Sequence, residues 1–195
     1  MLLTDNYQVP TQSKYMKLED GENRLRILSE IIVGTEYWVE VDGNRKPKRV
    51  QPNVKIPMGD VTVNQFGNPS ISAFWSMVVW NYSAKQVQIL NITQKDIMKS
   101  MLAYKKDADW GDLTKYDLVI TREKGERVKY TVIAKPHREL DADIKKTYEG
   151  MEINLDNLYV SEKFPYGGDP FAEKIEVEEV ENEFAEMDAA IDAIN

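Results

Sequence analysis

The sequence predicts a mainly β protein with five strands and one helix, in a single domain with appendages. Several short segments alternate apolar and polar residues, which is the pattern of strands with one buried face. One segment between them, residues 93–106, has apolar residues at helical spacing instead. The chain has 195 residues and is 42% hydrophobic, which suffices for one core and excludes wholesale disorder.

The first alternation runs over residues 23–41 and crosses Gly34. This pattern predicts one long strand that bends at the glycine, or two short strands. Because the polar positions alternate with the apolar ones, we expect Arg24, Arg26 and Trp38 on the solvent-facing side.

Residues 42–73 contain four prolines and three glycines, so they are predicted to form a long loop or insertion. Between residues 43 and 59 this loop carries five basic residues and no acidic one, namely Arg45, Lys46, Lys48, Arg49 and Lys55. A loop of this length inside a compact domain is commonly functional or mobile. The alternative is a solvated loop that only keeps the protein soluble.

Residues 73–82 and 85–92 are predicted to form a tight hairpin. Its expected register pairs Trp80 with Val87 and places that apolar face in the core. The opposite face is expected to be half exposed, and it carries Trp75, Met77, Asn81, Gln86 and Gln88. A change of one residue in the turn would exchange the two faces.

A helix is expected to follow this hairpin. Thr93 and Asp96 fit a capping box at its start, and the helix should end before Trp110. Its apolar face is formed by Ile97, Met98, Met101 and Leu102.

Two further strands, 116–122 and 127–135, are predicted on either side of a turn at 124–126. In the second strand Arg127 and Lys129 are expected to point outward. Beyond it, residues 139–149 are expected to form a short helix and residues 155–160 a short strand.

The predicted order is three strands, a helix and two strands, which is the order of elements in an OB-fold, a five-stranded Greek-key barrel. Here the long insertion would lie between strands 1 and 2. OB-folds bind oligonucleotides across strands 2 and 3, between the loops that join strands 1–2 and 4–5. An α+β sandwich is the alternative architecture.

The body contains the motifs FWSMVVWNY at 74–82, ILNITQ at 89–94, WGD at 110–112, YDLVITR at 116–122 and YTV at 130–132. Together with LRIL at 25–28 and EYW at 36–38, they resemble the single-stranded DNA-binding proteins of tailed phages. The resemblance covers residues 15–136, and it implies an OB-fold protein with an acidic C-terminal tail that coats DNA in replication, recombination and repair. Some such proteins carry a structural zinc, which a chain with no Cys and one His does not match.

The charge of the chain is unevenly distributed. The net charge is −8, but residues 171–195 contain nine acidic residues and one basic residue, so the rest of the chain is neutral. We therefore expect an OB-fold DNA-binding domain over 1–163, with a core at 15–136 and an extension at 137–163. A linker is expected at 164–170 and a disordered acidic tail at 171–195.

Apolar residues recur in the tail at spacings of three and four, the period of an amphipathic helix. This pattern predicts a segment that folds onto replication proteins, such as a polymerase or a helicase-primase, or that covers the DNA site. The expected contact residues are Glu178, Glu179, Glu181, Phe184, Met187 and Asp188. A short terminal helix packed on the body is the alternative.

The expected DNA site combines basic side chains with aromatic rings. The loop bases, with Arg24, Arg26, Arg127 and Lys129, would neutralise phosphates, and Trp38 and Trp75 would stack on bases. The alternatives are solvated strand faces and tryptophans that belong to the core.

No catalytic motif, cofactor site or metal site is predicted, so the chain is not expected to be an enzyme. His137 is expected at the surface after the last strand, and Asp107, Asp109 and Asp112 in a solvated turn. The sequence shows no signal peptide and no membrane span, which predicts a cytoplasmic location. A monomer or weak homo-oligomer is expected. A virion β-barrel without nucleic acid and an RNA-binding OB protein are the alternatives to DNA binding.

Overall fold

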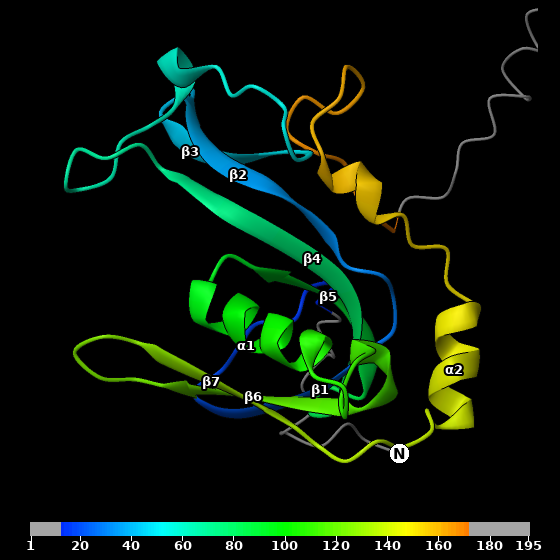
Figure 1. Cartoon of the computed structure of the whole chain (residues 1–195). Helices are drawn as coiled ribbons and strands as arrows, with labels where there is room; N and C mark the ends of the chain where they lie inside the picture. The colour runs from blue at the N-terminus through cyan, green and yellow to red at the C-terminus, as the bar shows by residue number, and fades with distance from the viewer. Residues whose placement is uncertain (1–12, 172–195) are drawn as a thin grey trace, which may run out of the picture.

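The computed structural model describes residues 13–171, and this part of the chain is mainly β (Figure 1). It forms an open antiparallel sheet of seven strands, accompanied by two α-helices. The strands are β1 (Gly21–Ile27), β2 (Ile32–Val41), β3 (Asn44–Val50), β4 (Ile71–Asn81), β5 (Gln86–Ile92), β6 (Asp117–Glu123) and β7 (Lys129–Ala134). The predicted mainly β class is confirmed, whereas no pairing between the described strands closes the sheet into a barrel.

Strand β4 is the centre of the sheet. Its first half pairs with β2, its second half pairs with β1, and β5 runs along its other edge. β1 also pairs with β6, and β6 with β7. β1 and β2 therefore occupy successive parts of the same edge of β4. β4 itself curves over the length of the molecule (Figure 1).

The break between β1 and β2 lies at residues 28–31, so the expected bend at Gly34 is wrong. The Ser29 hydroxyl accepts a hydrogen bond from the Val78 N–H at 2.9 Å, in place of a backbone carbonyl. Gly34 has another role. A Cβ at this position would lie 2.2 Å from the Val50 carbonyl oxygen and 3.1 Å from the Tyr159 ring, so only glycine allows this close approach.

The expected loop at 42–73 contains strand β3, which pairs with β2 along its whole length. Asp42 and Gly43 form the turn with φ of 53° and 74°, the backbone that a two-residue hairpin turn requires. The loop prediction is therefore wrong for residues 44–50. The error has a physical reason, since β3 is an edge strand and an edge tolerates Pro47 among charged side chains.

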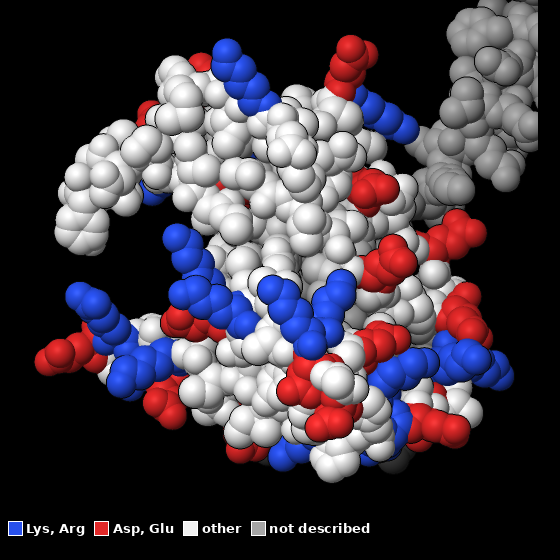
Figure 2. Space-filling model, viewed as in Figure 1, with Lys and Arg blue, Asp and Glu red and all other residues white. Residues whose placement is uncertain are grey.

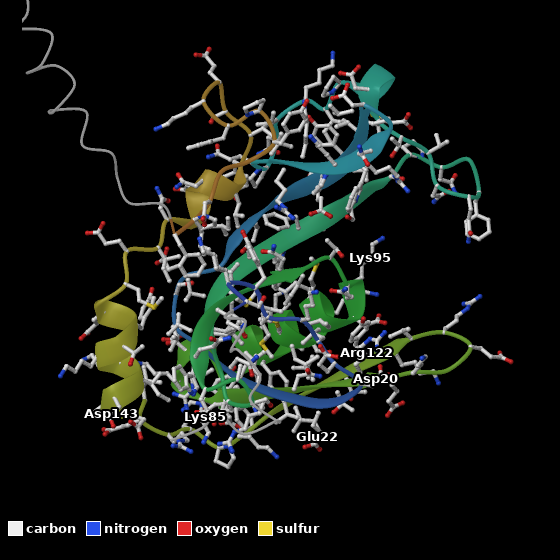
Figure 3. The ribbon with its side chains drawn as sticks, turned by 180° about the vertical axis from the view of Figure 1, so that it is seen from behind. Asp20, Glu22, Lys85, Lys95, Arg122 and Asp143 are labelled. Carbon is white, nitrogen blue, oxygen red and sulfur yellow. The ribbon has the colours of Figure 1, made fainter. Side chains whose placement is uncertain are left out.

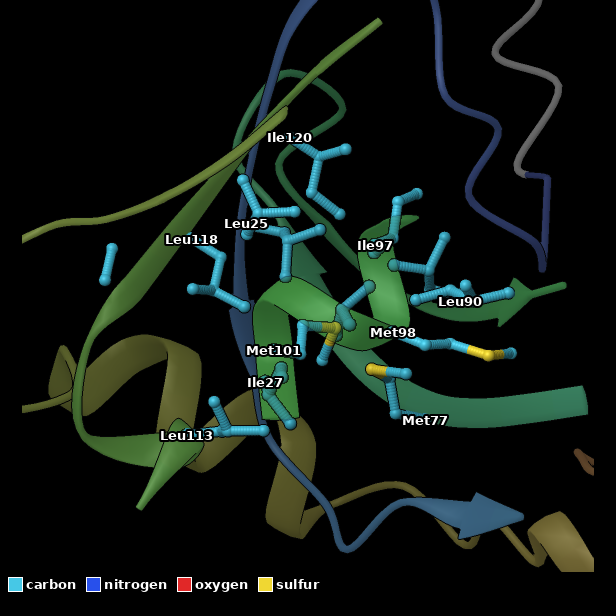
Figure 4. Close-up of a cluster of buried hydrophobic side chains, with 14 of the residues drawn as sticks. Leu25, Ile27, Met77, Leu90, Ile97, Met98, Met101, Leu113, Leu118 and Ile120 are labelled. Carbon is cyan, nitrogen blue, oxygen red and sulfur yellow. The ribbon is translucent and has the colours of Figure 1, made fainter. Parts of the chain in front are cut away.

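Helix α1 (Lys95–Lys106) covers the main hydrophobic cluster, in which Ile97, Met98 and Met101 pack against β1, β4, β5 and β6 (Figure 4). Gln94 is the N-cap residue and makes no capping hydrogen bond with its side chain. The predicted capping box is therefore not formed. Leu102, expected on the buried face, is 39% exposed.

The hairpin of β4 and β5 has the predicted register, with Trp80 opposite Val87. The expectation that one face is half exposed is met only in part, because Trp75, Asn81 and Gln86 are partly exposed whereas Met77 and Gln88 are buried. Met77 and its neighbours lie under α1, and Phe74 and Val78 form a second cluster with Leu155 and Leu158. The residues that bury this second face, Leu155 and Leu158, belong to the C-terminal extension. The sequence of the hairpin alone therefore does not reveal that this face is covered.

The extension includes the predicted short helix, α2 (Ala142–Glu149). Residues 155–158, expected in a strand, form a 3-10 helix instead. The expected linker at 164–170 is attached to the body, since the Gly168 N–H donates to the Asn157 carbonyl at 2.6 Å and the Asn154 N–H to the Pro170 carbonyl at 2.8 Å. The six predicted partner-binding residues of the tail lie outside the described residues. Over residues 13–171, no helix has the length and apolar character needed to cross a membrane.

Candidate nucleic-acid interface

Two lobes project from the same side of the body and leave a hollow between them (Figures 1 and 2). We call the upper lobe the arm; it consists of β2, β3, the first half of β4 and the loop 51–70. The lower lobe is the hairpin of β6 and β7. Figure 2 shows basic side chains along the lower side of this hollow, which we call the groove.

Trp75 and Lys95 lie where the arm joins the body. Trp75 shares one face of β4 with Met77, which α1 covers, and is itself only partly buried against the main cluster. Val33, its partner on β2, is 40% exposed on the same face. Lys95 begins α1, between the arm and the hairpin of β6 and β7 (Figure 3). Trp75 and Val33 thus place an aromatic ring and an exposed aliphatic side chain on one face of the arm, and α1 begins with the ammonium group of Lys95.

Trp38 lies on the opposite face of the sheet from Trp75, so the two predicted stacking residues do not form one surface. The Arg45 guanidinium lies 5.6 Å from the Trp38 ring centroid and donates hydrogen bonds of 2.9 Å to Thr62 Oγ1 and Ser70 Oγ. Trp38, Arg45 and Ser70 line a shallow cavity of about 360 Å³. A half-buried indole held beside a guanidinium can stack on a base next to a phosphate.

The other basic residues of the arm have different environments. Lys46 and Lys48 both place their ammonium groups 5.0 Å from the ring centroid of Tyr166, in the C-terminal extension. Arg49 forms an ion pair with the buried Glu36 carboxylate at 2.9 Å and lies over Phe74, so its role is structural. The fifth predicted base, Lys55, is exposed in the loop.

Arg26 is not at the surface, so its expected outward position is wrong. Its side chain is 1% exposed, and its Nε donates to Asp117 Oδ1 at 2.7 Å. The Arg24 guanidinium donates to the other carboxylate oxygen, Asp117 Oδ2. The Tyr82 hydroxyl donates to Asp117 Oδ1 at 3.0 Å. The strand alternation cannot reveal this arrangement, because Asp117 and the segment that covers Arg26 are distant in sequence.

Burial by itself would raise the pKa of Asp117. In the folded protein, however, the pKa of this carboxyl group lies below its usual value. The hydrogen bond from Arg24, the charge of Arg26 and the hydrogen bond from Tyr82 favour the carboxylate and outweigh the burial. Asp117 is therefore a carboxylate that holds two arginines and orders the sheet behind the groove.

The lower lobe presents Arg127 and Lys129 as exposed side chains, in agreement with their expected orientation. With Lys124 they line a shallow cavity at the turn between β6 and β7, which also contains Glu123 and Glu126. Further toward the body, Arg122 forms an ion pair with Asp20 (Figure 3). The available positive charge of this lobe is therefore at its tip.

Phe66 is the most exposed aromatic side chain at the arm and is not among the predicted site residues. It is 76% exposed and lies in an ordered turn, where Asn64 Oδ1 accepts hydrogen bonds from the N–H groups of Phe66 at 2.9 Å and Asn68 at 3.1 Å. Gly67 completes the turn with φ of 77°. The turn motif NQFGN, with an aromatic residue at its centre, is the signal in the sequence.

No group of three His, Cys, Asp or Glu side chains between residues 13 and 171 is arranged to hold a metal ion. His137 is exposed, as expected, and stacks on Tyr116 with ring centroids 5.1 Å apart. Asp112 accepts hydrogen bonds from Thr114, which lower the pKa of its carboxyl group, as in a solvated turn.

Comparison of the chain with protein-family models, with curated proteins and with solved structures finds no match. The assignment of a function therefore rests on the geometry of the groove and on the charges and rings around it.

Proposed function

We propose that this chain is a non-enzymatic protein that binds single-stranded DNA without strong sequence preference, as the single-stranded DNA-binding proteins of tailed phages do. In this role it coats exposed strands during replication, recombination and repair, and its acidic tail recruits replication proteins. The observation that carries the proposal is one groove with the exposed ring of Phe66 and the partly buried ring of Trp75 on the arm, and with the exposed basic side chains of Arg127 and Lys129 on the opposite lobe.

The pairing of the strands supports this proposal. β1 lies between β4 and β6, β4 pairs with β5, β6 pairs with β7, and α1 follows β5. This order supports a partly open OB-fold, in which the arm would elaborate the connection between the first two barrel strands. In such a fold oligonucleotides bind between that connection and the turn of the last two strands, which are the two lobes here.

The groove supplies both interactions that sequence-tolerant binding requires. Bases stack on Phe66 at the tip of the arm and on Trp75 at the inner end, each contact contributing about 1–3 kcal/mol. Phosphates pair with Lys95, Arg127 and Lys129, and each neutralised phosphate contributes about −0.7 to the salt slope. Trp38 with Arg45 offers a further contact for a strand that continues around the arm.

A titration of the full-length protein with unlabelled oligothymidylate, followed by tryptophan fluorescence, tests the proposal. We expect saturable quenching, with an affinity that falls linearly on a logarithmic salt axis. Absence of quenching, or quenching that is insensitive to salt, would refute DNA binding. A preference for the matched RNA oligomer in competition would move the assignment to RNA.

A further inference from the structure

A cavity of about 850 Å³ lies between β1 and the chain that follows β7. Helix α2 contributes Lys145, Tyr148 and Glu149 to its lining and lies on the opposite side of the body from the turn between β6 and β7 (Figure 1). Its size is within the range of pockets that hold small molecules. The cavity belongs to neither the arm nor the lower lobe, so it requires an explanation of its own.

The wall of this cavity contains a buried arginine that shares its counterion with a second arginine. Arg24 and Arg26 share the single carboxylate of Asp117, so one positive charge remains after this pairing. Arg26 contributes to the wall and is 1% exposed. A buried guanidinium that is only partly neutralised is costly, and an anion nearby would remove that cost.

The Arg26 guanidinium also has an unused donor. Its Nη1 donates to the carbonyl oxygens of Thr114 at 3.4 Å and Arg138 at 3.2 Å, and both residues line the cavity. Its Nη2 is buried and has no hydrogen-bond partner in the described part of the chain. Buried donors of this kind are rare in folded proteins, and each calls for a partner.

The other lining residues add to the positive charge. Lys115 and Arg138 form no ion pair within residues 13–171. Lys145 lies 3.8 Å from the Glu149 carboxylate, and Glu139 is the second acidic residue of the lining. The basic side chains therefore exceed the acidic ones around the cavity.

We propose that this cavity binds the phosphate group of a ligand of mononucleotide size, with the exposed Lys115 and Arg138 side chains donating to its oxygens and the buried Arg26 guanidinium behind them adding positive charge. Guanidinium groups match the geometry of phosphate, and the ammonium group of Lys115 adds a point charge. The phosphate can belong to a free nucleotide or to a nucleic-acid chain. The inference is independent of DNA binding in the groove, because it concerns other residues and another face.

The lone histidine of the chain makes this site directly observable. His137 lines the cavity and is the only histidine, so its imidazole C–H signals in an NMR spectrum report on this place alone. The full-length protein is titrated with inorganic phosphate and with thymidine monophosphate, at constant pH and ionic strength. We expect a saturable shift of the His137 signals with both probes.

Two exposed side chains serve for the variants. Lys115→Gln and Arg138→Gln should each weaken binding of thymidine monophosphate by roughly ten- to hundredfold, the effect of one lost charge-assisted hydrogen bond. Lys17→Gln, an equally exposed change away from the cavity, should leave the titration unchanged. Equal thermal melting of the three variants shows that their folds are intact.

The proposal would be overturned if neither inorganic phosphate nor thymidine monophosphate shifts the His137 signals. It would also be overturned if Lys115→Gln and Arg138→Gln show the same titration as the unmodified protein. An oligothymidylate without terminal phosphates distinguishes the sources. A His137 shift with this oligomer supports binding of the DNA backbone, and a shift with the monophosphate alone supports a free ligand. The two proposals can fail separately. If the oligomer does not quench the tryptophan fluorescence but thymidine monophosphate shifts the His137 signals, the proposal of DNA binding is refuted and that of a phosphate site is supported.

Discussion

Replacement of Asp117 by asparagine would remove the negative charge between β1 and β6. The carboxylate is fully buried and accepts hydrogen bonds from Arg24, Arg26 and Tyr82. Without it the Arg26 guanidinium remains buried with no counterion. Loss of one partner of a buried ion pair costs about 3–5 kcal/mol, so we expect the free energy of unfolding to fall by that amount. For a domain of this size the corresponding decrease in Tm is roughly 6–20 °C.

Urea unfolding followed by tryptophan fluorescence measures this loss. If the m-value is unchanged, the shift of the midpoint gives the change in stability directly. Asp20→Asn is the matched control, because Asp20 pairs with Arg122 at the surface and its side chain is 53% exposed. We expect that control to lose less than about 1 kcal/mol.

The pH dependence follows from the same carboxylate. Asp117 has a lower pKa in the folded protein than in the unfolded chain, where aspartate titrates near about 3.9. The unfolded state therefore binds more protons in the acidic range, and stability should rise with pH through that range. The contribution is fully present above the pKa of the unfolded chain, about 3.9, and is lost as the pH falls through the lower pKa of the folded protein. Asp117→Asn should lack this part of the acid dependence.

A double variant separates the charge from the packing. Arg26→Met combined with Asp117→Leu replaces both partners by apolar groups, which is often close to neutral. It should recover part of the stability that Asp117→Asn loses. If Asp117→Asn costs no more than Asp20→Asn, or if the double variant recovers nothing, the reasoning about a buried ion pair is refuted.

Three further predictions concern the groove and the arm. Phe66→Ala should weaken binding of oligothymidylate about 5- to 150-fold, the loss of one stacked base, without a change in Tm because the ring is 76% exposed; equal affinity in a fluorescence titration would exclude Phe66 from the site. Gly34→Ala should lower the free energy of unfolding by about 1–3 kcal/mol, because the new Cβ would meet a backbone oxygen at 2.2 Å; Gly59→Ala, with open space around it, is the control in urea unfolding. The combined change Arg127→Gln and Lys129→Gln should reduce the salt slope of DNA binding by about 1.4; an unchanged slope would place the lower lobe outside the DNA path.

The sequence predicts the local elements of this protein well where their hydrophobic pattern is strong. The hairpin of β4 and β5 has the predicted register, and α1 lies within the predicted segment. Arg127 and Lys129 are exposed as expected. In each case the information is local, since a period of two or of 3.6 residues and a short turn specify the element.

Other predictions fail because contacts with another segment, and not the composition of the segment itself, decide them. The basic segment that begins after Gly43 has the composition of a loop, yet β2 provides an edge on which residues 44–50 pair as β3. Arg26 has the alternation of a surface residue, yet Asp117 draws it into the interior. An ion pair with Asp117 replaces the hydration that the Arg26 charge loses on burial, and only the folded structure shows that this partner is present.

By itself, the sequence determined the mainly β class, the helix between β5 and β6 and the separation of an acidic tail from a neutral body. These properties follow from periodicity and composition, which every stretch of chain carries locally. Only the tertiary structure decided which charges are free. It removed Arg26 and Arg49 from the candidate site, placed Trp38 and Trp75 on opposite faces, and exposed Phe66 on the arm. The physical reason is that burial, ion pairing and the two faces of a sheet depend on contacts between segments far apart in the chain.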